Sequence, residues 1–106
     1  MRDQNCFIYM IRPYRARFMD TMTENEEKIM DEHFEYLKAL FREKKVILAG
    51  PCLDSTFGLV VYTADSKEEA QEIMNHDPSI TAGIMKAELH PFRISLLQTI
   101  KESKEK

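Results

Sequence analysis

The stretch VILAGPCLDSTFGLVVYT, residues 46–63, decides the fold. It holds two apolar runs, residues 46–49 and 57–63, which predict two strands. Gly50-Pro51 is expected to end the first strand, and the short link that follows favours antiparallel pairing. Residues 59–61, Leu-Val-Val, are apolar without alternation, which predicts that the second strand is buried on both faces.

A long helix is expected before these strands, over residues 24–44. Thr23 and Glu26 fit a capping box at its start. Acidic residues crowd its first turns and basic residues its last, as the helix dipole favours. Apolar residues recur at steps of three and four and predict the buried stripe of an amphipathic helix: Ile29, Met30, Phe34, Leu37, Leu40 and Phe41.

A shorter helix is expected after the two strands. Residues 66–69, Ser-Lys-Glu-Glu, fit a second capping box. The helix should end near His76, because Pro78 disfavours the helical conformation in the residue before it. Pro78 could then open one further short turn.

Strands are also expected at the two ends of the domain, at residues 6–11 and 84–89, and the second could continue through residues 92–97. The order is then β-α-β-β-α-β, the ferredoxin-like pattern of an α+β fold with a four-stranded antiparallel sheet. Two helices can cover only one face of such a sheet, so the other face needs a partner. A homodimer that stacks its two sheets face to face is the simplest solution.

Composition bounds the function classes. With 106 residues the chain is one domain, expected at residues 1–100, with a charged, flexible tail at residues 101–106. A net charge of −3, from 15 basic and 18 acidic residues, argues against nucleic-acid binding. No apolar run approaches the ~20 residues of a membrane span, and we expect no secretory signal at the N-terminus. We therefore expect a cytoplasmic protein with both cysteines reduced.

His33 is the first candidate for chemistry, because its spacing places it on or beside the apolar stripe of the long helix. It is either a core-edge histidine with one satisfied hydrogen bond or a general base in a pocket between helix and sheet, a role that suits an imidazole. Asp77, just before Pro78, is either a turn residue or the partner that orients His33 and favours its charged form.

Other polar residues carry weaker signals. Asp54 either serves as a turn residue or lines the mouth of a pocket. Cys52, in the same loop, is either an inert thiol or a nucleophile. His76 and His90 are expected at the surface. No cluster of His, Asp or Glu has metal-ligand spacing, so no metal site is expected.

The stretch between the first strand and the long helix, residues 12–22, is rich in arginine and longer than a usual connection. Arg12, Arg15 and Arg17, with Tyr14, either receive an anionic group of a substrate or form a solvated loop. Of these, Arg12 is the candidate substrate-binding residue.

Short motifs in a fixed order carry a resemblance over residues 5–97. They are DEHFEYL (31–37), AGP (49–51), DSKEEA (65–70), HDP (76–78), AG (82–83) and PF (91–92). The ordered set resembles the YCII-related (YciI-like) family. The resemblance implies a ferredoxin-like fold that pairs into a dimeric α+β barrel.

The same resemblance implies an active site. The family's His and Asp pair maps onto His33 and Asp77, and the segment Gly50-Pro51 lies near that pocket. One relative is similar to a dehydrochlorinase that acts on a chlorinated hydroxyquinol by acid–base chemistry. The Arg-rich loop and the charged tail depart from the family pattern, so that substrate is not carried over.

Two functions compete. The first is a cofactor-free enzyme, a lyase like the dehydrochlorinase or a hydrolase, in which His33 and Asp77 perform acid–base chemistry on a small organic molecule. Elimination, isomerisation or hydrolysis would each fit. The second is a non-catalytic small-ligand-binding or accessory dimeric domain. A hydrogen bond between His33 and Asp77 beside an open cavity would favour the enzyme.

Overall fold

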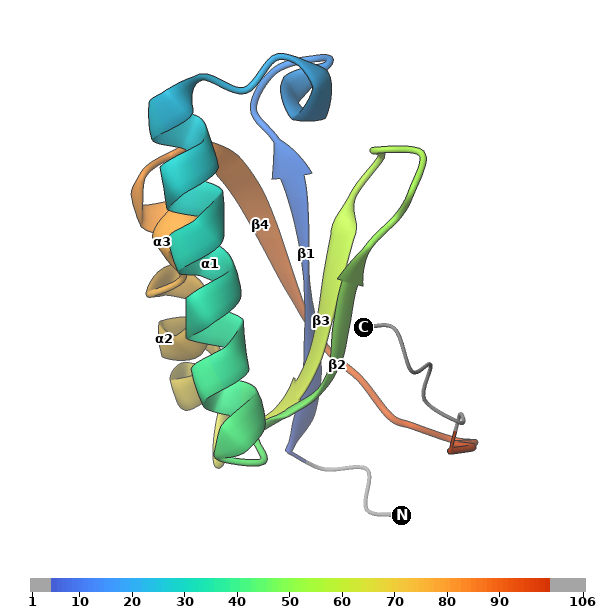
Figure 1. Ribbon diagram of the computed structural model, residues 1–106. Helices are drawn as coiled ribbons and strands as arrows, with labels where there is room; N and C mark the ends of the chain where they lie inside the picture. The colour runs from blue at the N-terminus through green and yellow to red at the C-terminus, as the bar shows by residue number, and fades with distance from the viewer. Residues whose placement is uncertain (1–4, 100–106) are drawn as a thin grey trace.

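The order of helices and strands follows the predicted pattern (Figure 1). The structure, a computed structural model, describes residues 5–99. Its elements are β1 (Cys6–Pro13), the short 3-10 helix η1 (Phe18–Asp20), α1 (Glu24–Arg42), β2 (Val46–Pro51), β3 (Gly58–Thr63), α2 (Lys67–Asn75), α3 (Pro78–Thr81) and β4 (Met85–Pro91). The expected domain end at residue 100 and the tail at residues 101–106 lie outside the described residues.

The four strands form one antiparallel sheet in the order β2-β3-β1-β4. This order is that of the ferredoxin-like α+β fold. All three α-helices lie on one face of the sheet (Figure 1), as two crossover connections of the same hand require. No helix within residues 5–99 is long and apolar enough to cross a membrane.

The predicted end of β2 was wrong, because the strand continues through Gly50-Pro51. Pro51 pairs with Gly58 at the tip of the β2–β3 hairpin. Since β2 is an edge strand, a proline without an N–H can be accommodated there. The predicted continuation of β4 through residues 92–97 does not occur, since β4 ends at Pro91.

The two capping boxes differ. At α1 the Thr23 hydroxyl accepts from the Glu26 N–H at 3.1 Å, and the Glu26 carboxylate accepts from the Thr23 N–H at 3.0 Å, as predicted. At α2 the Ser66 hydroxyl accepts from the Glu69 N–H at 3.0 Å, but the Glu69 carboxylate accepts from the Asp65 N–H at 2.6 Å. The second box is therefore only half formed.

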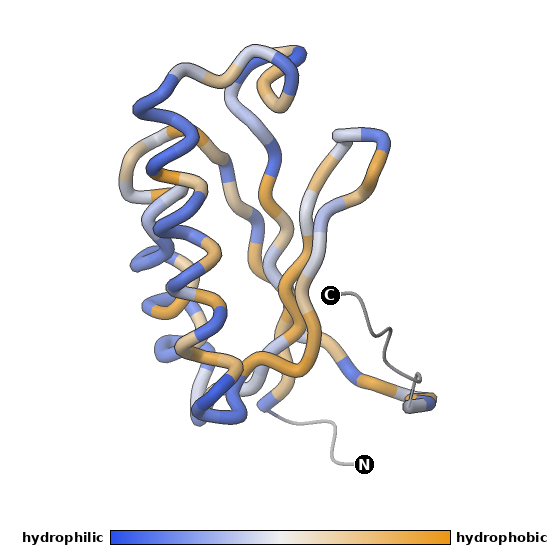
Figure 2. The backbone as a smooth tube through the Cα atoms, viewed as in Figure 1, coloured by the Kyte–Doolittle hydropathy of each residue, from blue (hydrophilic) through white to orange (hydrophobic). Residues whose placement is uncertain are grey.

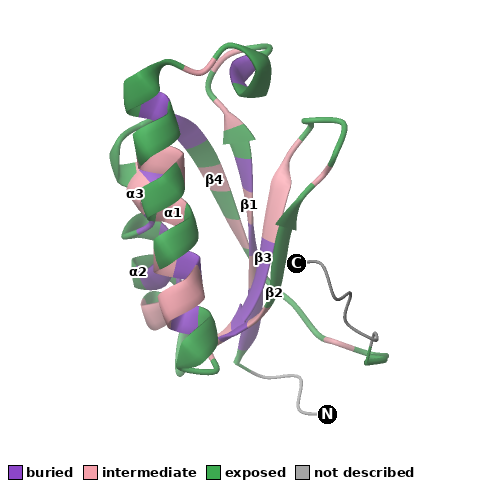
Figure 3. Ribbon diagram, viewed as in Figure 1, coloured by how far each residue is buried: buried purple, intermediate pink, exposed green. Residues whose placement is uncertain are grey.

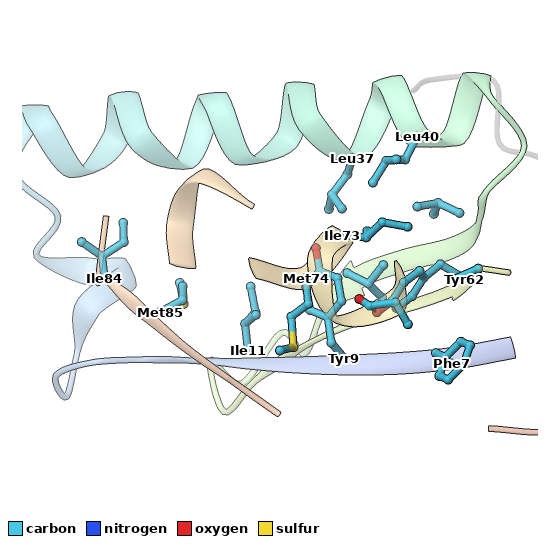
Figure 4. Packing of buried hydrophobic residues seen from close by; sticks show 14 of the residues in the cluster. Phe7, Tyr9, Ile11, Leu37, Leu40, Tyr62, Ile73, Met74, Ile84 and Met85 are labelled. Carbon is cyan, nitrogen blue, oxygen red and sulfur yellow. Dashed lines mark hydrogen bonds between the residues drawn. The ribbon is translucent and has the colours of Figure 1, made fainter. Parts of the chain in front are cut away.

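The core lies between the helices and the sheet (Figure 4). Along α1 hydrophilic and hydrophobic residues alternate, with exposed residues outward and the more buried ones toward the sheet (Figures 2 and 3). Leu37 and Leu40 form the buried centre of the predicted stripe. Phe34 and Phe41 were wrongly assigned to it: they are 58% and 60% exposed, because they lie on the flank of the helix.

The loop before α1 is tied to that helix through one carboxylate. Glu26 accepts a hydrogen bond from the Tyr14 hydroxyl at 2.7 Å and from the Arg15 guanidinium at 2.8 Å. The bonds from Arg15, the Thr23 N–H and Tyr14 lower the pKa of Glu26 to about 2. The loop and the helix start therefore share one anionic anchor.

This anchor predicts acid sensitivity. Because the folded-state pKa of Glu26 is below its ordinary value of 4.5, its stabilising contribution is present above pH 4.5 and is lost as the pH falls toward 2. In urea unfolding between about pH 5 and 2.5, Glu26→Gln should reduce the fall in stability. Glu27→Gln changes an exposed carboxylate in the same turn and should not reduce the fall in stability. Equal slopes of stability against pH in the two variants would contradict the role of Glu26 as an anchor.

Candidate active site

A cavity of about 430 Å³ lies between α1, the sheet and the β2–β3 hairpin. Its lining is mostly apolar, and it includes Ile11, Met30, Leu37, Phe57 and Val60. None of the described residues that line it is Asp, Glu, Lys or Arg. A site of this size and character suits a small, largely uncharged molecule.

His33 contributes an imidazole to this cavity. It lies on α1 one turn before Leu37, so its ring is carried on the helix face that packs toward the sheet. The side chain is 12% exposed. Nδ1 lies 2.8 Å from Oδ1 and 2.9 Å from Oδ2 of Asp77, a residue 44 positions along the chain.

Asp77 is held behind the imidazole and does not line the cavity. It is fully buried and serves as the N-cap of α3, where its carboxylate accepts from the Ser79 N–H at 2.9 Å. The same carboxylate accepts from the Ser79 hydroxyl at 2.8 Å and from the Tyr9 hydroxyl at 2.7 Å. Asp77 is thus both a turn residue and the partner of His33.

The electrostatics favour a carboxylate at Asp77. Burial raises the pKa of Asp77, but the hydrogen bond and charge of His33 and the bonds from Tyr9 and Ser79 outweigh burial and leave the pKa below its ordinary value. Burial and the Asp77 charge raise the pKa of Tyr9, so Tyr9 remains a neutral donor. Because an ionised carboxylate only accepts, the Nδ1 of His33 is the donor in this contact.

Four of the residues singled out from the sequence lie in the β2–β3 hairpin, and three of them line the cavity. Gly50 and Pro51 line the cavity, and so does Cys52. The structure does not bring Asp54 there: its exposed carboxylate accepts from the N–H and hydroxyl of Thr56, at 3.1 and 2.5 Å. Asp54 is therefore a turn residue, because a short side chain in a tight loop bonds the nearest backbone donor.

Arg12 does not line this cavity either. It lines an adjoining hollow of about 350 Å³, formed by residues 12–20 with Ser55 and Thr56, which shares Pro13, Met19 and Ser55 with the cavity. Arg12 pairs with Glu88 of β4 at 3.3 Å. Arg15 pairs with Glu26 and Arg17 with Asp20. Only the Arg15–Glu26 pair is largely buried, whereas Arg12 and Arg17 pair with carboxylates at the surface.

The sequence analysis missed Tyr9 and Ser79. Ser79 follows Asp77-Pro78, so the N-cap geometry of a short helix could have indicated it. Tyr9 stands in an apolar strand, and its only signal is a hydroxyl at a buried position, which calls for a hydrogen-bond partner. His76 and His90 are exposed, as expected.

Comparisons with known proteins show the family. The sequence profile of the YCII-related domain matches residues 7–93. The uncharacterised protein YjpA of Bacillus subtilis (strain 168) is 40% identical over 70 residues, which are 66% of this chain and 81% of YjpA.

A solved structure is similar in fold. The 5-chloro-2-hydroxyhydroquinone dehydrochlorinase TftG of Burkholderia phenoliruptrix AC1100, in complex with 2,5-dihydroxybenzoquinone, superposes with a TM-score of 0.62. The match covers 82% of this chain and 93% of that chain at 20% identity. At this identity the likeness shows a shared fold.

Proposed function

The chain belongs to the YCII-related domain family, and from that premise we propose that it is a cofactor-free enzyme whose general base is His33. The observation that carries the proposal is the bond between His33 Nδ1 and the buried Asp77 carboxylate, on a residue that lines an apolar cavity. A base in such a place needs a fixed tautomer and a neighbouring charge, and Asp77 supplies both.

The chemistry would be proton transfer. Nε2 of His33 would remove a proton from a C–H or O–H group of the substrate, and the Asp77 carboxylate would stabilise the imidazolium that forms. In an elimination the electron pair of the broken bond to hydrogen expels the leaving group. The imidazolium of His33 later releases its proton to water. An isomerisation would return the proton to another atom of the substrate, and a hydrolysis would activate water.

The substrate is small and largely apolar in this proposal. A carboxylate or phosphate would lose its hydration in the cavity without gaining a lysine or arginine partner, which is unfavourable. A volume of about 430 Å³ accommodates a single substituted ring. The related dehydrochlorinase is named for a chlorinated hydroquinone and was solved with a dihydroxybenzoquinone, which supports a ring of this kind.

A ligand screen tests the proposal. Neutral phenols, quinones and lactones, and matched compounds that carry a carboxylate or phosphate, would be added to wild type and His33→Ala and followed by NMR. We expect neutral rings to bind selectively and wild type alone to convert one of them. Binding by both proteins with no conversion in either would instead support the non-catalytic ligand-binding domain.

We further propose that the protein forms a homodimer through the helix-free face of the sheet. Strand alternation places Ile8, Met10 and Leu59 on that face, together with Leu48, which is 49% exposed. This part of the face is apolar, whereas β4 adds Glu88 and His90 beside it. An exposed apolar patch of this kind is typical of an interface. Sedimentation at micromolar concentration should give a dimer, and Leu48→Glu should shift it toward monomer. A wild-type monomer would contradict this.

A further inference from the structure

We propose that Tyr9 and Ser79 are positioning residues that hold the Asp77 carboxylate against His33. They thereby keep the proton of the neutral imidazole on Nδ1 and leave a lone pair on Nε2. The inference rests on the proposed role of His33 as the base. It extends the site from a pair to four residues, of which only His33 lines the cavity. Tyr9 and Ser79 were not indicated by the family resemblance.

Each oxygen of the Asp77 carboxylate accepts hydrogen bonds from a different residue. Oδ2 of Asp77 accepts from the Tyr9 hydroxyl at 2.7 Å, and Oδ1 accepts from the Ser79 hydroxyl at 2.8 Å and from its N–H at 2.9 Å. Both oxygens then face Nδ1 of His33, at 2.8 and 2.9 Å. The Ser79 hydroxyl is 3.4 Å from Nδ1, too long to displace either carboxylate contact.

These donors come from different parts of the fold. Tyr9 belongs to the central strand β1 and Ser79 to α3, whereas His33 belongs to α1. Tyr9, Asp77 and Ser79 are each fully buried, so water cannot replace a missing donor. The orientation of the carboxylate is therefore set by protein groups alone, and each donor removes one way in which it could rotate.

The consequence for His33 concerns its tautomer. A neutral imidazole carries one proton, and the nitrogen that bears it is set by the hydrogen bond that the ring makes. With an oriented carboxylate at Nδ1, the proton stays on Nδ1 and Nε2 has a free lone pair. If the carboxylate turns away, the other tautomer becomes populated, and a protonated Nε2 cannot accept a proton from a substrate.

Tyr62 provides a matched comparison within the same sheet. It is as fully buried as Tyr9, and the centroids of the two rings lie 5.4 Å apart. Its hydroxyl, however, donates to the backbone carbonyl of Ala70 at 2.7 Å. Tyr62→Phe therefore removes a buried hydroxyl and a bond of the same length while leaving Asp77 untouched.

The test uses the ¹⁵N resonances of the His33 ring, read at the alkaline end of a pH series where they no longer change. We expect wild type and Tyr62→Phe to show the Nδ1–H tautomer. In Tyr9→Phe and Ser79→Ala the two ring nitrogens should move toward each other, as in a mixture of tautomers. If both variants are folded and keep the wild-type pattern, the inference is overturned.

The spectra need no substrate, so the two proposals can fail separately. Shifted tautomers together with full turnover in His33→Gln would refute the role of His33 as the base, while the positioning contacts would stand. Unchanged tautomers together with a loss of turnover in His33→Gln would refute positioning and leave the base intact. Once a substrate is known, Tyr9→Phe should lower kcat more than it changes KM, because Tyr9 does not line the cavity.

Discussion

Replacing His33 by glutamine is expected to lower turnover by roughly 10²- to 10⁴-fold, the usual contribution of a general acid or base. The glutamine amide can still donate a hydrogen bond to Asp77, so the buried carboxylate keeps a partner and the protein should fold. It cannot accept a proton from the substrate at neutral pH. The measurement is the initial rate of conversion of a compound found in the ligand screen, at saturating concentration.

The matched control is His76→Gln, the same substitution at an exposed histidine whose ring bonds the carbonyl of Glu72. It should retain the wild-type rate. Binding of the ligand by His33→Gln, followed by NMR, separates loss of chemistry from loss of the site. Retention of the full rate in His33→Gln would remove His33 from the mechanism.

Replacing Asp77 by leucine should lower the free energy of unfolding by about 3–5 kcal/mol, as expected when one partner of a buried polar pair is removed. The Tyr9 and Ser79 hydroxyls would lose their acceptor in a fully buried site. Unsatisfied buried donors cost about 1–3 kcal/mol each, and loss of the N-cap of α3 adds about 1 kcal/mol. Urea unfolding at neutral pH measures the change.

Two further variants make this prediction specific. Asp77→Asn keeps an oxygen for the N-cap and should be the milder change, whereas Asp54→Asn alters an exposed turn carboxylate and should have little effect. A leucine variant as stable as wild type would mean that the carboxylate contacts add nothing to the fold.

The same carboxylate predicts a pH dependence. The pKa of Asp77 in the folded protein is below its ordinary value of 3.8. Its contribution to stability is therefore complete above the ordinary pKa and is lost as the pH falls through the lower, folded-state value. In Asp77→Asn, stability should fall less steeply in acid than in wild type. A parallel fall would indicate that this residue does not titrate on unfolding.

The fold was predictable because its signals are local. Capping at Thr23, the alternation of apolar runs and the Pro78 boundary each act within a few residues, and together they leave one ferredoxin-like order. The end of β2 was not predictable in the same way. Whether Gly50-Pro51 stops a strand depends on whether that strand lies at the edge of the sheet, which is a property of the assembled fold.

In the site, too, local features could be predicted from the sequence, whereas contacts between distant residues could not. His33 could be singled out from helix spacing, but its contact with Asp77 spans 44 positions. From the residues alone that contact was one of two interpretations of Asp77, and the family resemblance favoured it. The surroundings of Arg12 could not be predicted for a similar reason. Its carboxylate partner, Glu88, comes from β4, and only the antiparallel pairing of β1 with β4 brings the two side chains together.

The double duty of Asp77 has a consequence for how this family is compared. A descendant that had lost its chemistry would still need an acceptor at this position to keep α3 and the buried hydroxyls in place, so selection for stability alone would retain the aspartate. Selection for stability would not retain His33 at the edge of the cavity, so this residue could change. Among relatives, the residue at the position of His33 should therefore distinguish active enzymes from inactive proteins, whereas the aspartate should not.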